Sequence, residues 1–283
     1  MILHCFTKDE MKKRLKILYM FLFVLLHQNV LVVKDANSSG WREERGKHFI
    51  IKYPSSETAS WARDILNKSE IYYDKVAQDI GYARYRNFWT WDNRAVITIY
   101  SDRDAFVEAT GQPEWSRGGV VGHKQLSNTR SIISFVQEGS FVDETLPHEI
   151  SHLILWDFIG FEKVIPMWFE EGVAQLQEAE KAARARHAMK GLIEANEYVP
   201  FDVLFNVDIR DEEDSLKVTV FYLESYTIVK FLIDEYGNQR FGSLCRNLRD
   251  GKNFESALKD AYVLKINSVE DLEKKWLSYM KKQ

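Results

Sequence analysis

Short β-rich stretches alternate with helical stretches in the first half of the chain. The β-rich stretches are dominated by Ile, Val, Phe and Tyr, which is typical of strands. Between them, apolar residues recur close to every 3.6 positions, which favours amphipathic helices. This alternation predicts a small mixed sheet with helices beside it. The expected strands are residues 48–53, 95–100 and 131–136, the expected helices are 55–80 and 102–110, and residues 118–122 are expected to form a loop or a bulged strand.

The second half of the chain carries almost only the helical pattern. Apolar residues keep the helical spacing over several segments, and Gly237 follows one of them, where a helix would end. A sheet followed by a run of helices is typical of the α+β class. We therefore predict an α+β fold in which a small mixed sheet is followed by a mostly helical C-terminal lobe. The expected helices are residues 173–195, 216–236, 240–249, 254–261 and 269–282.

The N-terminus has the order of segments found in a secretory signal. Residues 12–16 are mostly basic, residues 17–26 form an unbroken apolar run, and residues 30–33 are apolar again after a polar break. The interrupted run is short for a membrane span, which needs about 20 apolar residues. A cleaved signal peptide and an uncleaved signal-anchor both remain open. Either one would place the rest of the chain outside the cytoplasm.

Composition narrows the classes of function. The chain is 45% hydrophobic and 28% charged, as globular proteins are, and its net charge of −4 gives no electrostatic basis for binding nucleic acid. Its two cysteines are Cys5, within the leader, and Cys245, far along the chain. They cannot supply a disulfide framework or a cysteine-rich structural zinc site.

The clearest chemical signal is the sequence HEISH at residues 148–152. On a helix, His148 and His152 lie one turn apart on one face, so both can bind one metal ion. Glu149 lies beside them, close enough to polarise a metal-bound water. Glu171 follows after 18 residues, enough chain for a loop and a second helix to bring a carboxylate to the same metal. Because a buried helix can also carry two hydrogen-bonded histidines, the pentapeptide alone is a hypothesis.

Two histidines and one glutamate would leave the fourth position of a zinc ion open, as catalytic zinc sites do. An open zinc lowers the pKa of its bound water to about 7, which makes a nucleophile at neutral pH. Glu149 would take the proton from that water and later deliver it to the leaving amine. The residues therefore predict hydrolysis.

At these residues the chain resembles the gluzincin metallopeptidases, and most closely the peptidase MA-like group of thermolysin-related domains. The resemblance is carried by LPHEISH at residues 146–152 and IPMWFEEGVA at residues 165–174. It extends over most of the chain after about residue 41. It implies a zincin-like fold, with Glu149 as the general base. The zinc ligands that it implies are His148, His152 and Glu171, the last chosen over Glu170 because it directly precedes the glycine.

The resemblance breaks at one position near the expected site. Related enzymes usually carry a carboxylate four residues after the glutamate ligand, hydrogen-bonded to a ligand histidine, and here that position is Gln175. Its amide oxygen could still accept the bond as a neutral partner, or Glu178 on the same helical face could substitute. Such partners change metal affinity by about 10–100-fold, so the departure bears on affinity and not on the ligand set.

Two further parts of a peptidase site have candidates by the same resemblance. A Tyr on a later helix would stabilise the oxyanion, and Tyr222 matches the family's Y-x-x-S run better than Tyr226. Both tyrosines could equally be core aromatics. An edge strand would hold the extended substrate, and residues 118–124 and 131–136 are the candidates, although either could be an ordinary strand.

These observations predict a zinc metallopeptidase that acts on peptide or protein substrates outside the cytoplasm, either secreted or periplasmic, or anchored to the membrane through its N-terminal apolar segment. The alternative is a catalytically silent, zinc-binding envelope or assembly protein, which Gln175 favours and the retention of Glu149 disfavours. A helical protein with a fortuitous HExxH would bind no metal. The predicted regions are a signal peptide or signal-anchor at 1–36, a polar linker at 37–47, a sheet lobe with the metal site at 48–178 and a helical lobe at 179–283.

Overall fold

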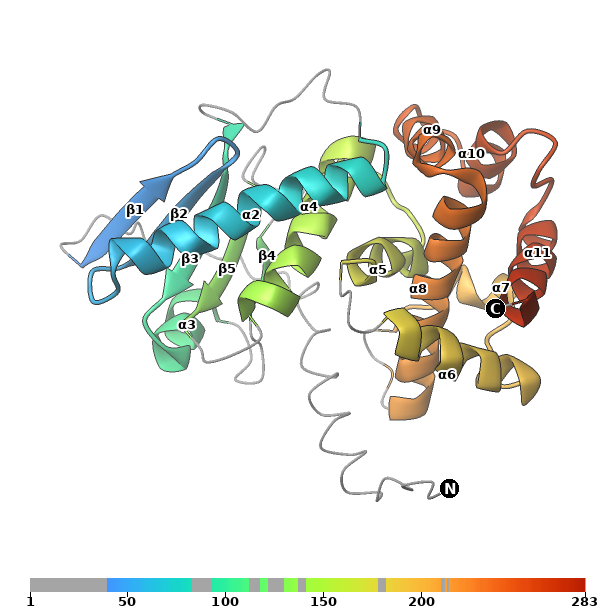
Figure 1. The fold of residues 1–283 in the computed structure, drawn as a ribbon, viewed down its shortest axis with the longest axis horizontal. Helices are drawn as coiled ribbons and strands as arrows, with labels where there is room; N and C mark the ends of the chain where they lie inside the picture. Colours follow the sequence, from blue (N-terminus) through green and yellow to red (C-terminus); the bar gives the residue numbers. More distant parts are fainter. Residues whose placement is uncertain are drawn as a thin grey trace.

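The computed structural model of the chain has an α+β architecture, with a sheet at one side and a group of helices at the other (Figure 1). The expected signal or signal-anchor at residues 1–36 lies outside the described residues. Within the described part, no helix combines the length and the apolar character needed to cross a membrane. The structure describes residues 40–82, 93–111, 118–121, 130–136, 141–177, 182–209, 212 and 214–282.

Five strands form one mixed sheet: β1 (Trp41–Arg45), β2 (Phe49–Pro54), β3 (Ala95–Tyr100), β4 (Gly118–Val121) and β5 (Ser131–Phe135). Their order is β1-β2-β3-β5-β4. β2, β3 and β5 run parallel, and β1 and β4 pair antiparallel at the two edges. The three parallel strands are the predicted ones, and most of their residues are buried, as expected of parallel strands covered on both faces.

The prediction of a polar linker at residues 37–47 is wrong over Trp41–Arg45, because this segment forms β1. β1 pairs with β2 from Trp41 opposite Pro54 to Arg45 opposite Ile50. As an edge strand it leaves most of its side chains at least partly exposed, so its sequence can be polar. Backbone pairing with β2 therefore makes this segment a strand, and an apolar pattern could not reveal it.

Helices cover both faces of the sheet. The helices α2 (Ala59–Asp79) and α4 (Leu146–Ile159) pack against each other on one face, whereas α3 (Arg103–Thr110) packs against β3 and β5. Neighbouring residues of β5 show the two faces: Ile132 belongs to the main core, and Ile133 to a smaller cluster with Phe106 of α3. α4 therefore lies between the sheet and the rest of the molecule.

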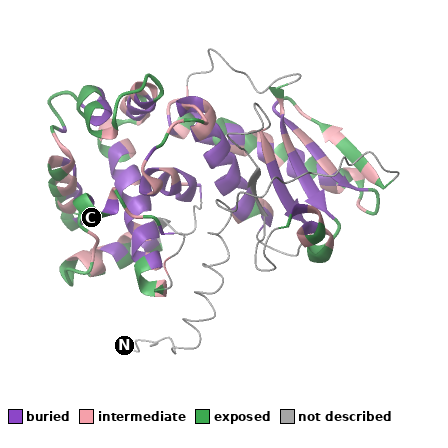
Figure 2. Ribbon diagram, turned by 180° about the vertical axis from the view of Figure 1, so that it is seen from behind, coloured by how far each residue is buried: buried purple, intermediate pink, exposed green. Residues whose placement is uncertain are grey.

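The second half contains α5 (Met167–Gln175), α6 (Ala182–Glu194), α7 (Phe201–Leu204), α8 (Ser215–Tyr236), α9 (Asn238–Arg249), α10 (Phe254–Ala261) and α11 (Val269–Lys282). α8 is central, since α5, α6, α9 and α11 all pack against it. Figure 2 shows α4 and α8 largely in the colour of buried residues, and 12 residues of each helix are buried. The predicted helices from residue 216 onward are confirmed within a residue or two.

The single helix predicted for residues 173–195 is wrong, because α5 ends at Gln175 and α6 begins at Ala182. Gln177, in the turn after α5, accepts a hydrogen bond from Lys75 Nζ at 2.7 Å and donates one to Asp79 Oδ2 at 3.1 Å. This tie to α2 holds the turn in place. Since it joins residues far apart in the chain, local periodicity could not indicate it.

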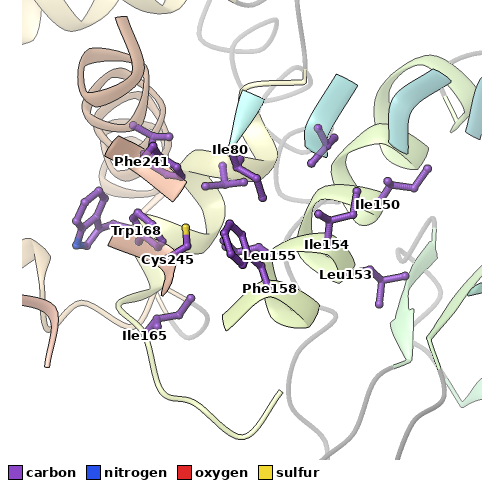
Figure 3. Close-up of a cluster of buried hydrophobic side chains, with 14 of the residues drawn as sticks. Ile80, Ile150, Leu153, Ile154, Leu155, Phe158, Ile165, Trp168, Phe241 and Cys245 are labelled. Atoms are coloured by element: carbon purple, nitrogen blue, oxygen red, sulfur yellow. The ribbon is translucent and has the colours of Figure 1, made fainter. Parts of the chain in front are cut away.

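The sheet half and the helical half share one hydrophobic core. Figure 3 shows Leu155 and Phe158 of α4 turned toward Ile165 and toward Cys245 of α9. All four side chains are buried. α4 thus packs against both halves of the molecule.

Candidate metal centre

The two histidines of HEISH lie on α4, which is almost entirely inside the protein. Each of its residues is buried except Trp156 and Asp157, which are partly exposed. Pro147 occupies the first turn, where its missing N–H leaves no hydrogen bond unmade. A π-helical turn, Phe141–Thr145, leads directly into α4. Such turns are frequent at functional sites.

A buried ion pair fixes the C-terminal turn of α4. The Asp157 carboxylate pairs with the Arg130 guanidinium, and their side chains are only 3% and 9% exposed. The same carboxylate accepts a hydrogen bond of 2.5 Å from the Tyr82 hydroxyl. Arg130 directly precedes β5 and Tyr82 follows α2, so Asp157 ties the site helix to both. Sequence reasoning missed this anchor, because its three members are distant in the chain.

Glu171 reaches the histidines because α5 crosses α8 very closely at the next residue. A Cβ atom on Gly172 would lie 2.3 Å from the Ser225 carbonyl oxygen and 2.5 Å from Val229 Cγ2 of α8. Only glycine permits this approach without a shift of the helices. α5 also packs against α4, so Glu171 is held between α4 and α8.

The three candidate ligand atoms form a compact triangle. His148 Nε2 and His152 Nε2 are 3.2 Å apart, and Glu171 Oε2 lies 3.7 Å from the first and 3.8 Å from the second. A tetrahedral zinc ion with bonds of about 2.0–2.1 Å would separate its ligand atoms by about 3.3 Å. Within the part of the chain that the structure describes, this is the one group of His, Cys, Asp or Glu close enough to hold a metal ion.

The surroundings of this triangle suit a metal ion. Burial, followed by the nearby His148, lowers the pKa of His152 well below its usual value, so its ring is neutral, as a ligand must be. Burial raises the pKa of Glu171 well above its usual value, and the Glu170 and Glu149 charges raise it further. Glu171 Oε2 has no hydrogen-bond partner among the described residues. A cation between these atoms would satisfy that oxygen and replace its proton.

Glu149 is the fourth buried polar residue of the group, at 6% exposed. It follows His148 on α4, and its charge acts on Glu171, so the two carboxyl groups are close. A carboxylate beside an open metal position can accept a proton from water there. Its burial and its charge near Glu171 are compatible with the general-base chemistry expected of this residue.

The structure distinguishes the two tyrosines of α8. Both are 5% exposed. Burial raises the pKa of Tyr222 well above its usual value, and the Glu171 carboxylate adds to this effect, so Tyr222 lies toward the metal centre. Burial also raises the pKa of Tyr226, but the charges that act on it are Arg186 and Asp234. The Tyr222 hydroxyl has no hydrogen-bond partner among the described residues and remains available as a donor.

Gln175 does not accept a hydrogen bond from His152. His152 Nδ1 is buried and has no hydrogen-bond partner in the described part of the chain. Glu178, the other candidate, lies outside the described residues. Instead, the His152 ring contacts the Trp156 ring, with centroids 5.5 Å apart. A sequence signal for this contact existed, since Trp156 follows His152 by one helical turn.

The two candidate substrate strands differ in their place in the sheet. β5 lies between β3 and β4, so both of its edges are paired, whereas β4 is the last strand in the order. Of the two, only β4 can pair with an extended peptide. Residues 122–124 of the candidate segment lie outside the described residues. His48 is not part of the candidate metal centre, and its Nδ1 pairs with Glu70 Oε2 at 2.6 Å.

Comparison with known proteins places most of the chain in a family. A search of curated proteins finds no match to this chain. The family model of the peptidase MA superfamily matches residues 81–282, which include α4, α5 and α8. The α+β architecture, with a small mixed sheet and a helical second half, is the zincin-like fold that the sequence resemblance implied. The chain belongs to the peptidase MA superfamily.

Proposed function

We propose that the protein is a zinc-dependent peptidase of the gluzincin type, which hydrolyses peptide bonds outside the cytoplasm. The observation that carries the proposal is the buried triangle of His148 Nε2, His152 Nε2 and Glu171 Oε2, with edges of 3.2–3.8 Å. Its size suits a tetrahedral zinc ion, and the three donors leave one position open for chemistry. The extracytoplasmic location rests on the N-terminal basic and apolar segments alone.

A bound zinc ion would supply a Lewis acid that makes water acidic enough to react near neutral pH. Glu149 takes the proton from the attacking water and passes it to the leaving amine. The Glu149 carboxyl group is buried, which excludes bulk water from that transfer. His148, His152 and Glu171 hold their donor atoms in place through the packing of α4 against α5.

The Tyr222 hydroxyl donates a hydrogen bond to the oxyanion that forms when the carbonyl carbon becomes tetrahedral. Its raised pKa keeps it protonated at neutral pH, so it can donate. The substrate is a peptide or protein, because the peptidase MA family and the antiparallel edge strand β4 both favour an extended chain.

Metal content and turnover test the proposal together. We expect about one zinc ion per wild-type chain, and loss of that ion in H152A. E149Q should keep the zinc and lower kcat on a peptide library by at least about 100-fold, because only the base is removed. Wild-type protein that takes up no metal even when zinc is supplied would contradict the proposal of a zinc-dependent peptidase. Zinc uptake without turnover would favour the silent envelope protein.

The same assay tests which of Tyr222 and Tyr226 stabilises the oxyanion. Y222F should lower kcat by about 100- to 1,000-fold, because one oxyanion donor is lost, while zinc content is unchanged. Y226F is the matched control, since Tyr226 is equally buried on the same helix and the charges that act on it are those of Arg186 and Asp234. Equal rates for Y222F and wild type would remove Tyr222 from the mechanism.

A further inference from the structure

We infer that Trp156 is the positioning residue for His152, and that contact between the two rings holds the imidazole, whose Nδ1 has no hydrogen-bond partner among the described residues. The inference rests on the proposed metal site, because it assigns Trp156 a role only through a ligand of that site. It concerns the departure at Gln175, the position where related enzymes carry a carboxylate that is hydrogen-bonded to a ligand histidine.

A metal-binding histidine usually donates its second ring N–H to an oxygen, which fixes the ring plane and the tautomer. In this chain His152 Nδ1 is buried without a hydrogen-bond partner among the described residues. Some other contact must therefore restrain the imidazole if Nε2 is to stay directed at the metal position.

Two aromatic contacts enclose the His152 ring. On one side its centroid is 5.5 Å from that of Trp156, with 32° between the planes, a tilted contact. On the other side the His148 ring meets it at 4.9 Å and 70°, edge to face. His148, His152 and Trp156 follow one another at intervals of one helical turn, so the three rings form a row along one face of α4.

Trp156 is itself in contact with an aromatic residue that follows α4 in the chain. α4 is followed by Gly160, whose φ of +113° turns the chain back, and the Phe161 ring lies 6.3 Å from the Trp156 ring between centroids. Trp156 is also only partly buried, in contrast to the residues before it on α4. A substitution there alters the row of rings without opening the core.

The zinc dissociation constant of the full chain, measured by competition with a chromophoric chelator, tests the inference. W156F keeps an aromatic face and should stay within about twofold of wild type. W156A should bind zinc about threefold to tenfold more weakly, the loss expected for one contact between rings. The absorption bands of the Co²⁺-loaded protein, which report ligand geometry, should change in W156A and not in W156F.

Three controls make the outcome decisive. W61A removes another partly buried Trp, which lies 6.3 Å from Tyr53 in the sheet half, and should change neither readout. Q175A and E178A should keep wild-type affinity. The inference is overturned if W156A binds zinc like wild type, or if Q175A or E178A alone reproduces the loss. Wild-type protein without any zinc affinity would instead defeat the proposed function, and this inference with it.

Discussion

Burial affects the glutamates of this chain differently according to what surrounds each one. Glu171 is buried against two imidazole nitrogens, so a cation can compensate its charge. Glu224, on α8, is fully buried, but only one of its carboxylate oxygens has a hydrogen-bond partner among the described residues. Its Oε2 accepts a hydrogen bond from the Val199 N–H at 2.9 Å, and its Oε1 has no partner among the described residues. A carboxyl group in such surroundings keeps its proton.

The pH dependence of stability should reveal Glu224. Burial raises its pKa to about 8, an effect that the Glu273 charge reinforces and the Val199 N–H opposes. Between about pH 4.5 and 8 the unfolded chain loses this proton while the folded chain keeps it, so stability falls as pH rises. E224Q lacks the titration. Its free energy of unfolding relative to wild type should therefore rise by a few kcal/mol from pH 5 to pH 8.

Urea denaturation at the two pH values measures this difference. The comparison between pH values cancels any constant cost of placing an amide at the site. A difference between E224Q and wild type that is the same at pH 5 and pH 8 would show that Glu224 is ionised in the folded protein.

At the scale of helices, the crossing of α5 and α8 brings Glu171 and Tyr222 together. The crossing depends on Gly172, which contacts the backbone of α8 at Ser225. Ser225 turns its own side chain inward, where Oγ donates to the Phe221 carbonyl at 2.7 Å. Two small residues therefore let the backbones approach, and the glutamate before the glycine lies beside the tyrosine as a result.

G172A should move these helices apart. The added methyl would lie 2.3 Å from the Ser225 carbonyl oxygen, so we expect a loss of about 1–3 kcal/mol in the free energy of unfolding, together with weaker zinc binding. G191A in α6 is the matched control, because a Cβ there meets nothing within 4 Å. It should be neutral or stabilising by up to about 1 kcal/mol, since alanine favours a helix over glycine. Equal stability and zinc affinity in G172A and wild type would mean that the crossing is not tight.

At the scale of the whole molecule, the sheet half and the helical half are joined through α4. One side of this helix packs toward α2 and the sheet, and Leu155 and Phe158 pack toward α9 (Figure 3). The C-terminal end of α2 also reaches α9, where Asn238 Nδ2 donates to the Gln78 carbonyl at 2.9 Å. The two histidines of the candidate metal centre thus lie on an element to which both halves are fixed.

The sequence alone determined the parts of this protein that depend on neighbours along the chain. The spacing of His148 and His152 on one helix face follows from 3.6 residues per turn. The three parallel strands were predicted because buried strands are rich in β-branched and aromatic residues. Glu171 was predicted from the motif around it, and its place beside both histidines agrees with that prediction.

Only the tertiary structure decided what depends on segments far apart in the sequence. It made Trp41–Arg45 a strand through pairing with β2, and it ended α5 at Gln175 next to a contact with α2. Neither of these features has a local pattern, because each results from the packing of one element against another. Periodicity reports which face of an element is buried, but not which residue of another element it meets.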